Sequence, residues 1–322
     1  MNLELTSPTA PNSFSDKLAN SVALLRRHQK LAVEMSPGGY YLAFSGGKDS
    51  QALYHVAKLA GVRFEPHYAV TTLDPPELVK FIRTHYPDVI FDHPHEPFVS
   101  LCLRKRMLPT MKIRFCCALL KETKGAGSVT LTGVRREESA RRARRNEVEV
   151  AGHKFSGSSS QFDQFTRSKR VEPLRCVDGR DKVIVNPIID WTARDVWHFL
   201  NGVVGVEHCC LYDEGWQRIG CMFCPMASQK NIERAERRYP KYRAKFIRLI
   251  DGLMQLGYYN DYPELTAEDI FSLWKSNSNI KRFIADKNAP QLFTSQQAGT
   301  TQLSTINYPL STINSQLSTH NS

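Results

Sequence analysis

One hexapeptide, Ser-Gly-Gly-Lys-Asp-Ser at 45–50, limits what this chain can fold into more than any other stretch. An apolar, aromatic run at 40–44 predicts a short buried strand before it, and a helix is expected from Gln51 onward. Two adjacent glycines allow successive N–H groups to point at one anion, and the positive end of the helix adds to the attraction. The predicted phosphate contacts are Ser45, Gly46, Gly47, Lys48, Asp49 and Ser50.

Two alternatives to this phosphate loop can be weighed. An ordinary Gly-Gly turn with a solvated Lys48 would explain the glycines alone, but the whole hexapeptide between a strand and a helix favours anion binding. A Walker-type loop is excluded, because that motif needs four residues between its first Gly and Gly-Lys-Ser/Thr.

Composition gives bounds on the class of protein. The 322 residues, 41% of them hydrophobic, are enough for one large domain or a domain with appendages, and we expect a soluble globular protein. No secretory signal pattern or membrane-length apolar run is evident, so we expect a cytoplasmic location without membrane contact. A net charge of +11 favours anionic partners, and eight cysteines favour metal, cluster or redox use over disulfides.

Strands and helices are expected to alternate. Strands at 62–71, 89–91, 129–132 and 183–189 with helices between them predict a doubly wound, mostly parallel, Rossmann-like α/β sheet. The Gly/Ser-rich stretch 151–169 is expected to be a mobile loop. The predicted parts are an N-terminal tail and first helix (1–35), a nucleotide-binding domain (36–228), a C-terminal helical extension (229–288) and a disordered repeat tail (289–322).

Several polar residues follow the predicted strands, where ligands bind in open parallel sheets. Asp74 could reach a nucleotide or its metal, or it could cap the helix that starts at Pro75-Pro76. Gly133 is a turn residue, and Arg135 and Arg136 behind it are expected to clamp phosphate or sulfate. The arginines of 142–145 are better explained as a solvated helix face.

The cysteines form two groups that must be read together. Cys116 and Cys117 point about 100° apart on a helix, so they share one site only if that site is large; two buried thiols are the alternative. Cys221 and Cys224 form a Cys-x-x-Cys turn, which alone could be half a zinc site or a redox dithiol. Together the pairs supply the four sulfur ligands that a 4Fe-4S cluster needs. The adjacent pair at 209–210 is an alternate source of ligands.

Family resemblance is carried by motifs that recur in order. The loop at 45–50 resembles the pyrophosphate loop (PP-loop) of the ATP pyrophosphatase superfamily. Further motifs at 114–121, 133–139, 185–197 and 211–224 make residues 40–230 resemble the adenylyl-sulfate and phosphoadenosine phosphosulfate (PAPS) reductase family. The resemblance implies an adenine nucleotide alpha hydrolase-like fold, and a 4Fe-4S cluster on the tandem Cys pair and the Cys-x-x-Cys.

Two departures from that family change the expected chemistry. Family reductases carry a catalytic Cys near the C-terminus, whereas no Cys follows Cys224 here, and their phosphate loop is usually degenerate, whereas this one is intact. We therefore expect an enzyme that binds ATP and Mg²⁺ and adenylates an acceptor, with Lys48, Asp49 and Arg135 as catalytic residues. Sulfur transfer to a nucleic acid would fit the basic charge, with a sulfur donor or thioredoxin-like protein as partner.

Two other functions stay open at this stage. A sulfonucleotide reductase acting on adenylyl sulfate or PAPS would use a partner's thiol, or Cys176 as a substitute nucleophile. A nucleotide-binding, redox-sensing subunit without catalysis is the alternative outside enzymes.

Overall fold

The computed structural model describes residues 13–151, 155–168, 182–276 and 278–288. The chain divides into two compact units, Met1–Ser278 and Asn279–Ser322. The predicted repeat tail, the first twelve residues and Cys176 lie outside the described residues.

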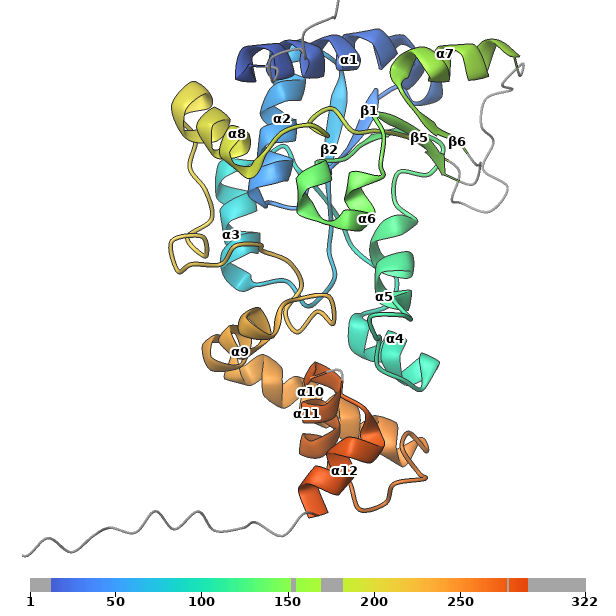
Figure 1. Ribbon diagram of the computed structural model, residues 1–322, viewed down its shortest axis with the longest axis vertical. Helices are drawn as coiled ribbons and strands as arrows, with labels where there is room; N and C mark the ends of the chain where they lie inside the picture. Colours follow the sequence, from blue (N-terminus) through green and yellow to red (C-terminus); the bar gives the residue numbers. More distant parts are fainter. Residues whose placement is uncertain (1–12, 152–154, 169–181, 277, 289–322) are drawn as a thin grey trace, which may run out of the picture. The chain divides into compact units, whose positions relative to one another are not determined.

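A single sheet of seven strands organises the described part of the first unit (Figure 1). Its order is β3-β2-β1-β4-β7-β5-β6; neighbours among the first five are parallel, and β5 pairs antiparallel with β7 and with β6. The predicted doubly wound, mostly parallel α/β fold is confirmed. The strands are β1 (Tyr40–Ala43), β2 (Phe64–Ala69), β3 (Ile90–Asp92), β4 (Val129–Leu131), β5 (Val148–Ala151), β6 (Phe155–Gly157) and β7 (Lys182–Val185).

Helices connect the strands and extend beyond them. They are α1 (Phe14–Met35), α2 (Lys48–Ala60), α3 (Pro76–His85), α4 (Phe98–Lys105), α5 (Phe115–Cys117), α6 (Ala140–Ala143), α7 (Ser159–Ser168), α8 (Ala193–Trp197), α9 (Gln229–Arg238), α10 (Pro240–Gln255), α11 (Ala267–Ser276) and α12 (Ile280–Asn288). Helix α5 continues as a π-helical turn, Ala118–Glu122, and α8 as another, His198–Val204. The helix α12 belongs to the second unit.

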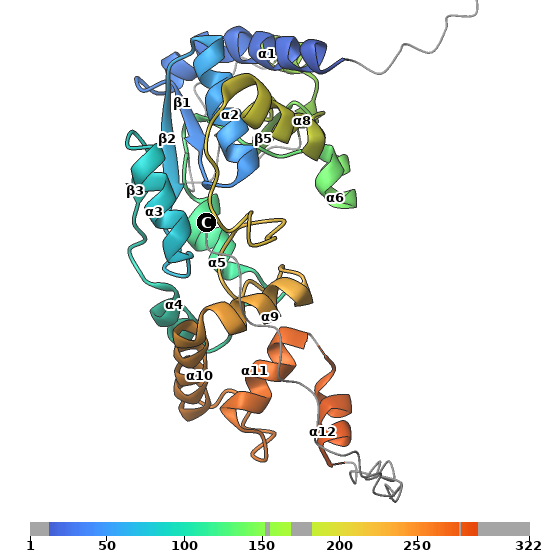
Figure 2. The same ribbon diagram turned by 90° about the vertical axis from the view of Figure 1, so that its left-hand side faces the viewer.

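The two faces of the sheet are covered differently. On one face Tyr40 and Leu42 are fully buried, and the Tyr40 hydroxyl donates to the Leu25 carbonyl of α1 at 2.6 Å. On the other face lies the segment that follows α5, because Lys182 Nζ donates to the carbonyls of Glu122 and Lys124. The crossover from β3 to β4 therefore passes on the face opposite α1, as right-handed connections require. Figure 2 shows α1 and α2 together against the strands.

Two local expectations need correction. The helix α2 begins at Lys48, three residues before the predicted start, so the last half of the hexapeptide forms the first helical turn. Residues 151–169 are not a loop throughout: they hold the end of β5, β6 and α7. Serine is a weak strand and helix former by itself, but hydrogen bonds to Ser158 and the buried side chain of Phe162 favour the helix here.

The C-terminal helices of the first unit pack on the cysteine-bearing region. The helix α10 contacts α4 and α11. Tyr239 interrupts the helical segment between α9 and α10, because Pro240 cannot continue the preceding helix. Phe246 of α10 lies 5.6 Å from Phe98 and 5.1 Å from Phe223, measured between ring centroids. Aromatic burial therefore anchors the helical extension next to the Cys-x-x-Cys turn.

Candidate functional site

The loop at 45–50 forms a cradle at the carboxyl end of β1. Gly46 has φ +70°, and a Cβ there would come within 2.8 Å of Ile82, so this position requires glycine. The Ser50 hydroxyl donates to the Gly47 carbonyl at 2.9 Å and accepts from the Ser45 N–H at 3.1 Å. Gly47, the N-cap of α2, has no side chain to fill the helix start, so the positive end of this 13-residue helix can attract an anion, although Tyr212 already binds the Lys48 N–H.

Three charged residues of the predicted site are linked in a chain. Lys48 Nζ donates to Asp49 at 2.8 Å, and Arg135 Nε donates to the other carboxylate oxygen of Asp49 at 2.7 Å. The Arg135 side chain is only 4% exposed and also donates to Glu137 and to the Trp191 carbonyl. Burial lowers the pKa of Arg135, but the Asp49 and Glu137 carboxylates more than offset that and raise it. Arg135 thus fixes Asp49 at the first turn of α2.

Gly133 belongs to the same cluster for a steric reason. A Cβ on Gly133 would lie 2.9 Å from the backbone oxygen of Asp49 and 3.3 Å from the Ser50 nitrogen. The carboxyl end of β4 therefore packs directly against the first turn of α2, which only glycine permits.

Arg136 is placed differently from its neighbour. Its guanidinium pairs with Asp190 and donates to the Arg145 carbonyl at 3.2 Å. Within the described residues its guanidinium makes no hydrogen bond to the loop at 45–50, so a phosphate contact from Arg136 stays a prediction.

Asp74 does not cap α3, whose N-cap is Pro75 without a side-chain bond. Its carboxylate accepts from the Thr71 N–H at 2.7 Å and the Thr71 hydroxyl at 2.8 Å. The buried Tyr68 hydroxyl has no hydrogen-bond partner of ordinary geometry among the described residues. Burial, together with the nearby Asp74 charge, raises the pKa of Tyr68. A polar pair, Tyr68 and Asp74, therefore lies at the carboxyl end of β2, and a contact of Asp74 with a nucleotide or its metal stays a prediction.

Tyr212 is a site residue that sequence reasoning did not single out. Its hydroxyl accepts from the Lys48 N–H at 2.8 Å and lies 3.3 Å from where a Cβ on Gly47 would be. Burial raises the pKa of Tyr212, so the hydroxyl keeps its proton, for which no acceptor is found among the described residues. Tyr212 stands 164 positions from Lys48. Only its place in the motif at 211–215 could have drawn attention to it.

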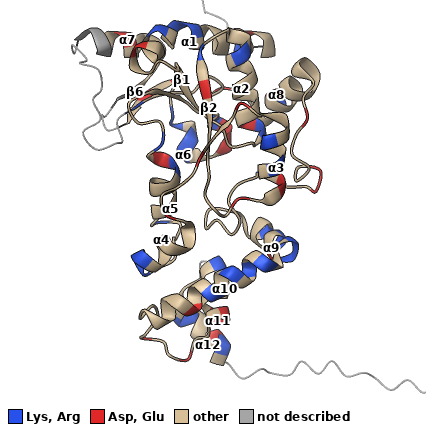
Figure 3. Ribbon diagram, turned by 180° about the vertical axis from the view of Figure 1, so that it is seen from behind, with Lys and Arg blue, Asp and Glu red and all other residues tan. Residues whose placement is uncertain are grey.

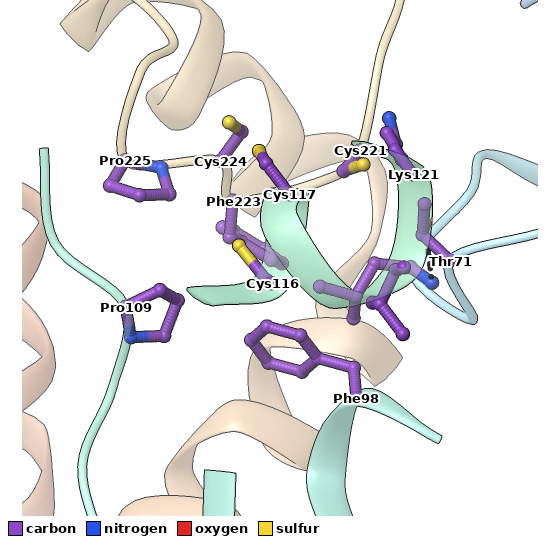
Figure 4. A pocket seen from close by; sticks show the side chains of 12 residues that line it. Thr71, Phe98, Pro109, Cys116, Cys117, Lys121, Cys221, Phe223, Cys224 and Pro225 are labelled. Atoms are coloured by element: carbon purple, nitrogen blue, oxygen red, sulfur yellow. Dashed lines mark hydrogen bonds between the residues drawn. The ribbon is translucent and has the colours of Figure 1, made fainter. Parts of the chain in front are cut away.

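All four predicted sulfur ligands line one pocket (Figure 4). Cys116 and Cys117 come from α5, Cys221 and Cys224 from the turn before α9, and Phe223 from the same turn completes the wall. A hydrogen bond between the adjacent thiols lowers the pKa of Cys117 and raises that of Cys116. No three His, Cys, Asp or Glu side chains within the described ranges converge closely enough to hold a single metal ion.

Lys121 is a second residue missed by sequence reasoning. It lines the thiol pocket. Loss of hydration lowers the pKa of Lys121. The negative charges of Cys221, Asp74 and Cys117 outweigh that effect, so the pKa is raised overall. Its position one helical turn after Cys117, in the motif at 114–121, was the available signal.

The remaining described cysteines lie elsewhere. Cys102 is buried in α4 and Cys209 is buried in the turn before Tyr212, whereas Cys210 is exposed. None of the three lines the pocket of the other four thiols. The four thiols of the set proposed first thus share one pocket, and the pair at 209–210 lies outside it; the ligand set itself stays a prediction.

One segment connects the phosphate loop to the thiol pocket. Tyr212 contacts the start of α2, and ten residues later the Met222 N–H donates to the Leu73 carbonyl at 2.8 Å. Leu73 follows β2, so both sites lie at the carboxyl end of the parallel strands. That edge is where ligands bind in open α/β sheets.

Comparison with known proteins agrees with this arrangement. A family model described as the phosphoadenosine phosphosulfate reductase domain matches residues 39–227. The chain belongs to this family. The matched range contains the loop at 45–50, Arg135 and all four pocket thiols, so the reductase-family domain is the part that carries the candidate site.

Individual relatives are distant. An uncharacterised protein of Methanocaldococcus jannaschii is 34% identical over 105 residues, which is 32% of this chain and 24% of the relative. An uncharacterised 37.8 kDa protein of Escherichia phage 186 is 26% identical over 46% of this chain and 41% of its own length. The chain thus spans less than half of these relatives. The crystal structure of PAPS reductase from Candida auris has a TM-score of 0.39 and 14% identity, covering 66% of this chain and 98% of that one.

Membrane contact can be assessed only in part. Among the helices in the described ranges, none combines the length and apolar character needed to cross a bilayer.

Proposed function

We propose that this PAPS reductase-family protein is an ATP-dependent adenylating enzyme that couples adenylation to sulfur transfer. The observation that carries the proposal is the intact loop at 45–50 at one edge of the sheet with the four-thiol pocket. Tyr212 and Met222 of one connecting segment contact the two sites. A cytoplasmic setting belongs to the proposal, because reducing compartments keep thiols free.

In the proposed reaction, an acceptor oxygen attacks the α-phosphorus of ATP. The bond between the α-phosphorus and the bridging oxygen breaks, and pyrophosphate leaves with the electron pair. The N–H groups at the start of α2 and Lys48 would hold the pyrophosphate, while Arg135 keeps Asp49 in place beside them. The Tyr212 hydroxyl would donate a hydrogen bond to a phosphate oxygen. Asp49 and Asp74 are the carboxylates available to Mg²⁺, which would neutralise phosphate charge.

In the second step, a sulfide ion (HS⁻) would displace AMP from the adenylated acceptor. The acceptor's bond to oxygen breaks as its bond to sulfur forms, and AMP carries away the electron pair. Cys116, Cys117, Cys221 and Cys224 would hold a 4Fe-4S cluster, because two cysteine pairs from separate segments line one pocket and thiolates are the ligands such clusters take. When bound, the cluster would supply a soft metal site for sulfur.

The experiment is product analysis with labelled ATP on protein purified without oxygen. We expect AMP and pyrophosphate once an acceptor is present, and their absence under all conditions would favour the redox-sensing subunit. The reductase alternative rests on the family itself and is tested in parallel with adenylyl sulfate or PAPS and reduced thioredoxin. If sulfite is released at an enzyme-like rate and this release is lost in Cys176→Ser, the protein is a reductase and the adenylation proposal is wrong.

A further inference from the structure

The helices α9 and α10 carry basic residues in two different environments. Arg238 pairs with Glu77 and Glu214, and Arg243 pairs with Glu236 and Glu268. Five others are exposed and have no carboxylate within ion-pairing distance among the described residues. These five form what we name the basic ridge: Lys230, Arg237, Lys241, Lys245 and Arg248.

The spacing of the basic ridge follows the helical repeat. Lys241, Lys245 and Arg248 stand at i, i+4 and i+7 of α10, which brings them onto one stripe about 10 Å long. Lys230 and Arg237 stand at i and i+7 of α9. Figure 3 shows Lys and Arg along both helices. A row of positive charges without local counter-charges is what a chain of phosphates would neutralise.

The ridge lies close to the thiol pocket in the chain and in space. Only residues 225–228 separate Cys224 from α9, which Ser228 caps. On α10, Phe246 packs against Phe223, which lines the thiol pocket. The helix α10 therefore supports the pocket through Phe246, whereas the ridge residues of α9 and α10 are exposed.

An anionic membrane fits these helices less well than a nucleic acid. Helices that bind membranes insert an apolar face, but most of the large apolar residues of α9 and α10 are buried in the protein, and Ile247 and Met254 are half-buried. The buried residues are Ile232, Ala235, Phe246, Leu249, Ile250 and Leu253.

We propose that the basic ridge binds the phosphodiester backbone of a nucleic acid, whose nucleotides are the acceptor presented to the thiol pocket. This inference rests on the proposed function, since it names the class of acceptor for that reaction. Backbone contacts of this kind supply affinity and position, and they carry no sequence preference by themselves.

The test measures binding of RNA strands, DNA strands and duplex DNA by fluorescence anisotropy over a range of salt concentrations. The ridge variant combines Arg237→Gln, Lys241→Gln and Lys245→Gln. We expect the slope of log Kd against log salt to fall by about 2.7 for duplex DNA or about 2.1 for single strands, since three phosphate contacts are lost. The matched control removes three exposed charges from α1, α3 and α8: Lys30→Gln, Lys80→Gln and Arg194→Gln.

Four results would contradict the proposal that the basic ridge binds nucleic acid. These are no binding by the wild type at low salt, equal losses in the ridge and control variants, equal competition by polyglutamate of matched charge, and tight binding to phosphatidylserine vesicles that the nucleic acid cannot displace. An unfolding midpoint close to that of the wild type verifies that each variant is folded. If the wild-type protein binds nucleic acid but forms no AMP, the proposed function is wrong and nucleic-acid binding by the basic ridge still stands. Wild-type protein that forms AMP but binds no nucleic acid overturns the ridge alone.

Discussion

Two adjacent arginines should differ sharply in what they contribute to stability. Arg135 is 4% exposed and donates to Asp49, Glu137 and a backbone carbonyl, whereas Arg136 pairs with Asp190, whose side chain is 58% exposed. Removing one partner of a buried pair costs about 3–5 kcal/mol, and a surface pair contributes about 0–1 kcal/mol. Because Asp49 and Glu137 are both partly hydrated, we expect the lower end, about 3 kcal/mol, for Arg135→Gln.

The assays are urea unfolding, which gives the free energy of unfolding, and thermal unfolding, which gives Tm, of wild type, Arg135→Gln and Arg136→Gln at one pH. A loss of about 3 kcal/mol corresponds to a drop of roughly 6–12 °C in Tm for a domain of this size, and Arg136→Gln should lower Tm by less than about 4 °C. The double variant Arg135→Gln with Asp49→Asn should cost less than the sum of the single changes, because each single change leaves the other charge unpaired. Equal losses for the two arginines, or full additivity with Asp49, would refute the reasoning.

Three further results are expected. Gly133→Ala should weaken ATP binding, because the added Cβ would displace the start of α2. Unchanged ATP affinity would argue against that close approach. Iron and sulfide content should fall in each pocket-cysteine variant and stay unchanged in Cys102→Ser, whose burial raises its pKa to about 12; full iron loading without Cys116 and Cys117 would transfer the role to the pair at 209–210. Burial, with the charge of Lys58, lowers the pKa of His55 from 6.5 to about 4. The unfolded chain therefore binds this proton first, stability falls as pH drops from about 7 towards 4, and the fall should be smaller in His55→Gln; an identical slope would contradict it.

Local patterns predicted the elements that local forces determine. The strands β1, β2 and β4 lie within a few residues of their expected ranges, and α3 starts at Pro76, as the Pro75-Pro76 pair indicates. The start of α2 was misplaced because glycine and serine suggest a loop, whereas Lys48 N–H has a partner in Tyr212 that stabilises an earlier helical turn.

Contacts between distant segments account for what the sequence could not predict. Both Arg135 and Arg136 follow a strand in the same motif, and their environments differ because Arg135 binds Asp49, 86 residues away, whereas Arg136 binds Asp190, 54 residues away. The grouping of the four thiols was predicted from the resemblance and the ligand count, and the structure brings them to one pocket. The pairing of Tyr212 with Lys48 depends on the path of a long connection, which no periodicity encodes.

The most direct test of adenylation is exchange of labelled pyrophosphate into ATP by the cluster-loaded protein in the presence of acceptor nucleic acid. Exchange reports reversible cleavage between the α- and β-phosphates and does not depend on the later sulfur step. We predict exchange by the wild type and its loss in Lys48→Ala, a variant that should stay folded because the change keeps the loop backbone and removes only the ion pair with Asp49. Release of ADP and phosphate without exchange, or exchange that persists in folded Lys48→Ala, would contradict the account.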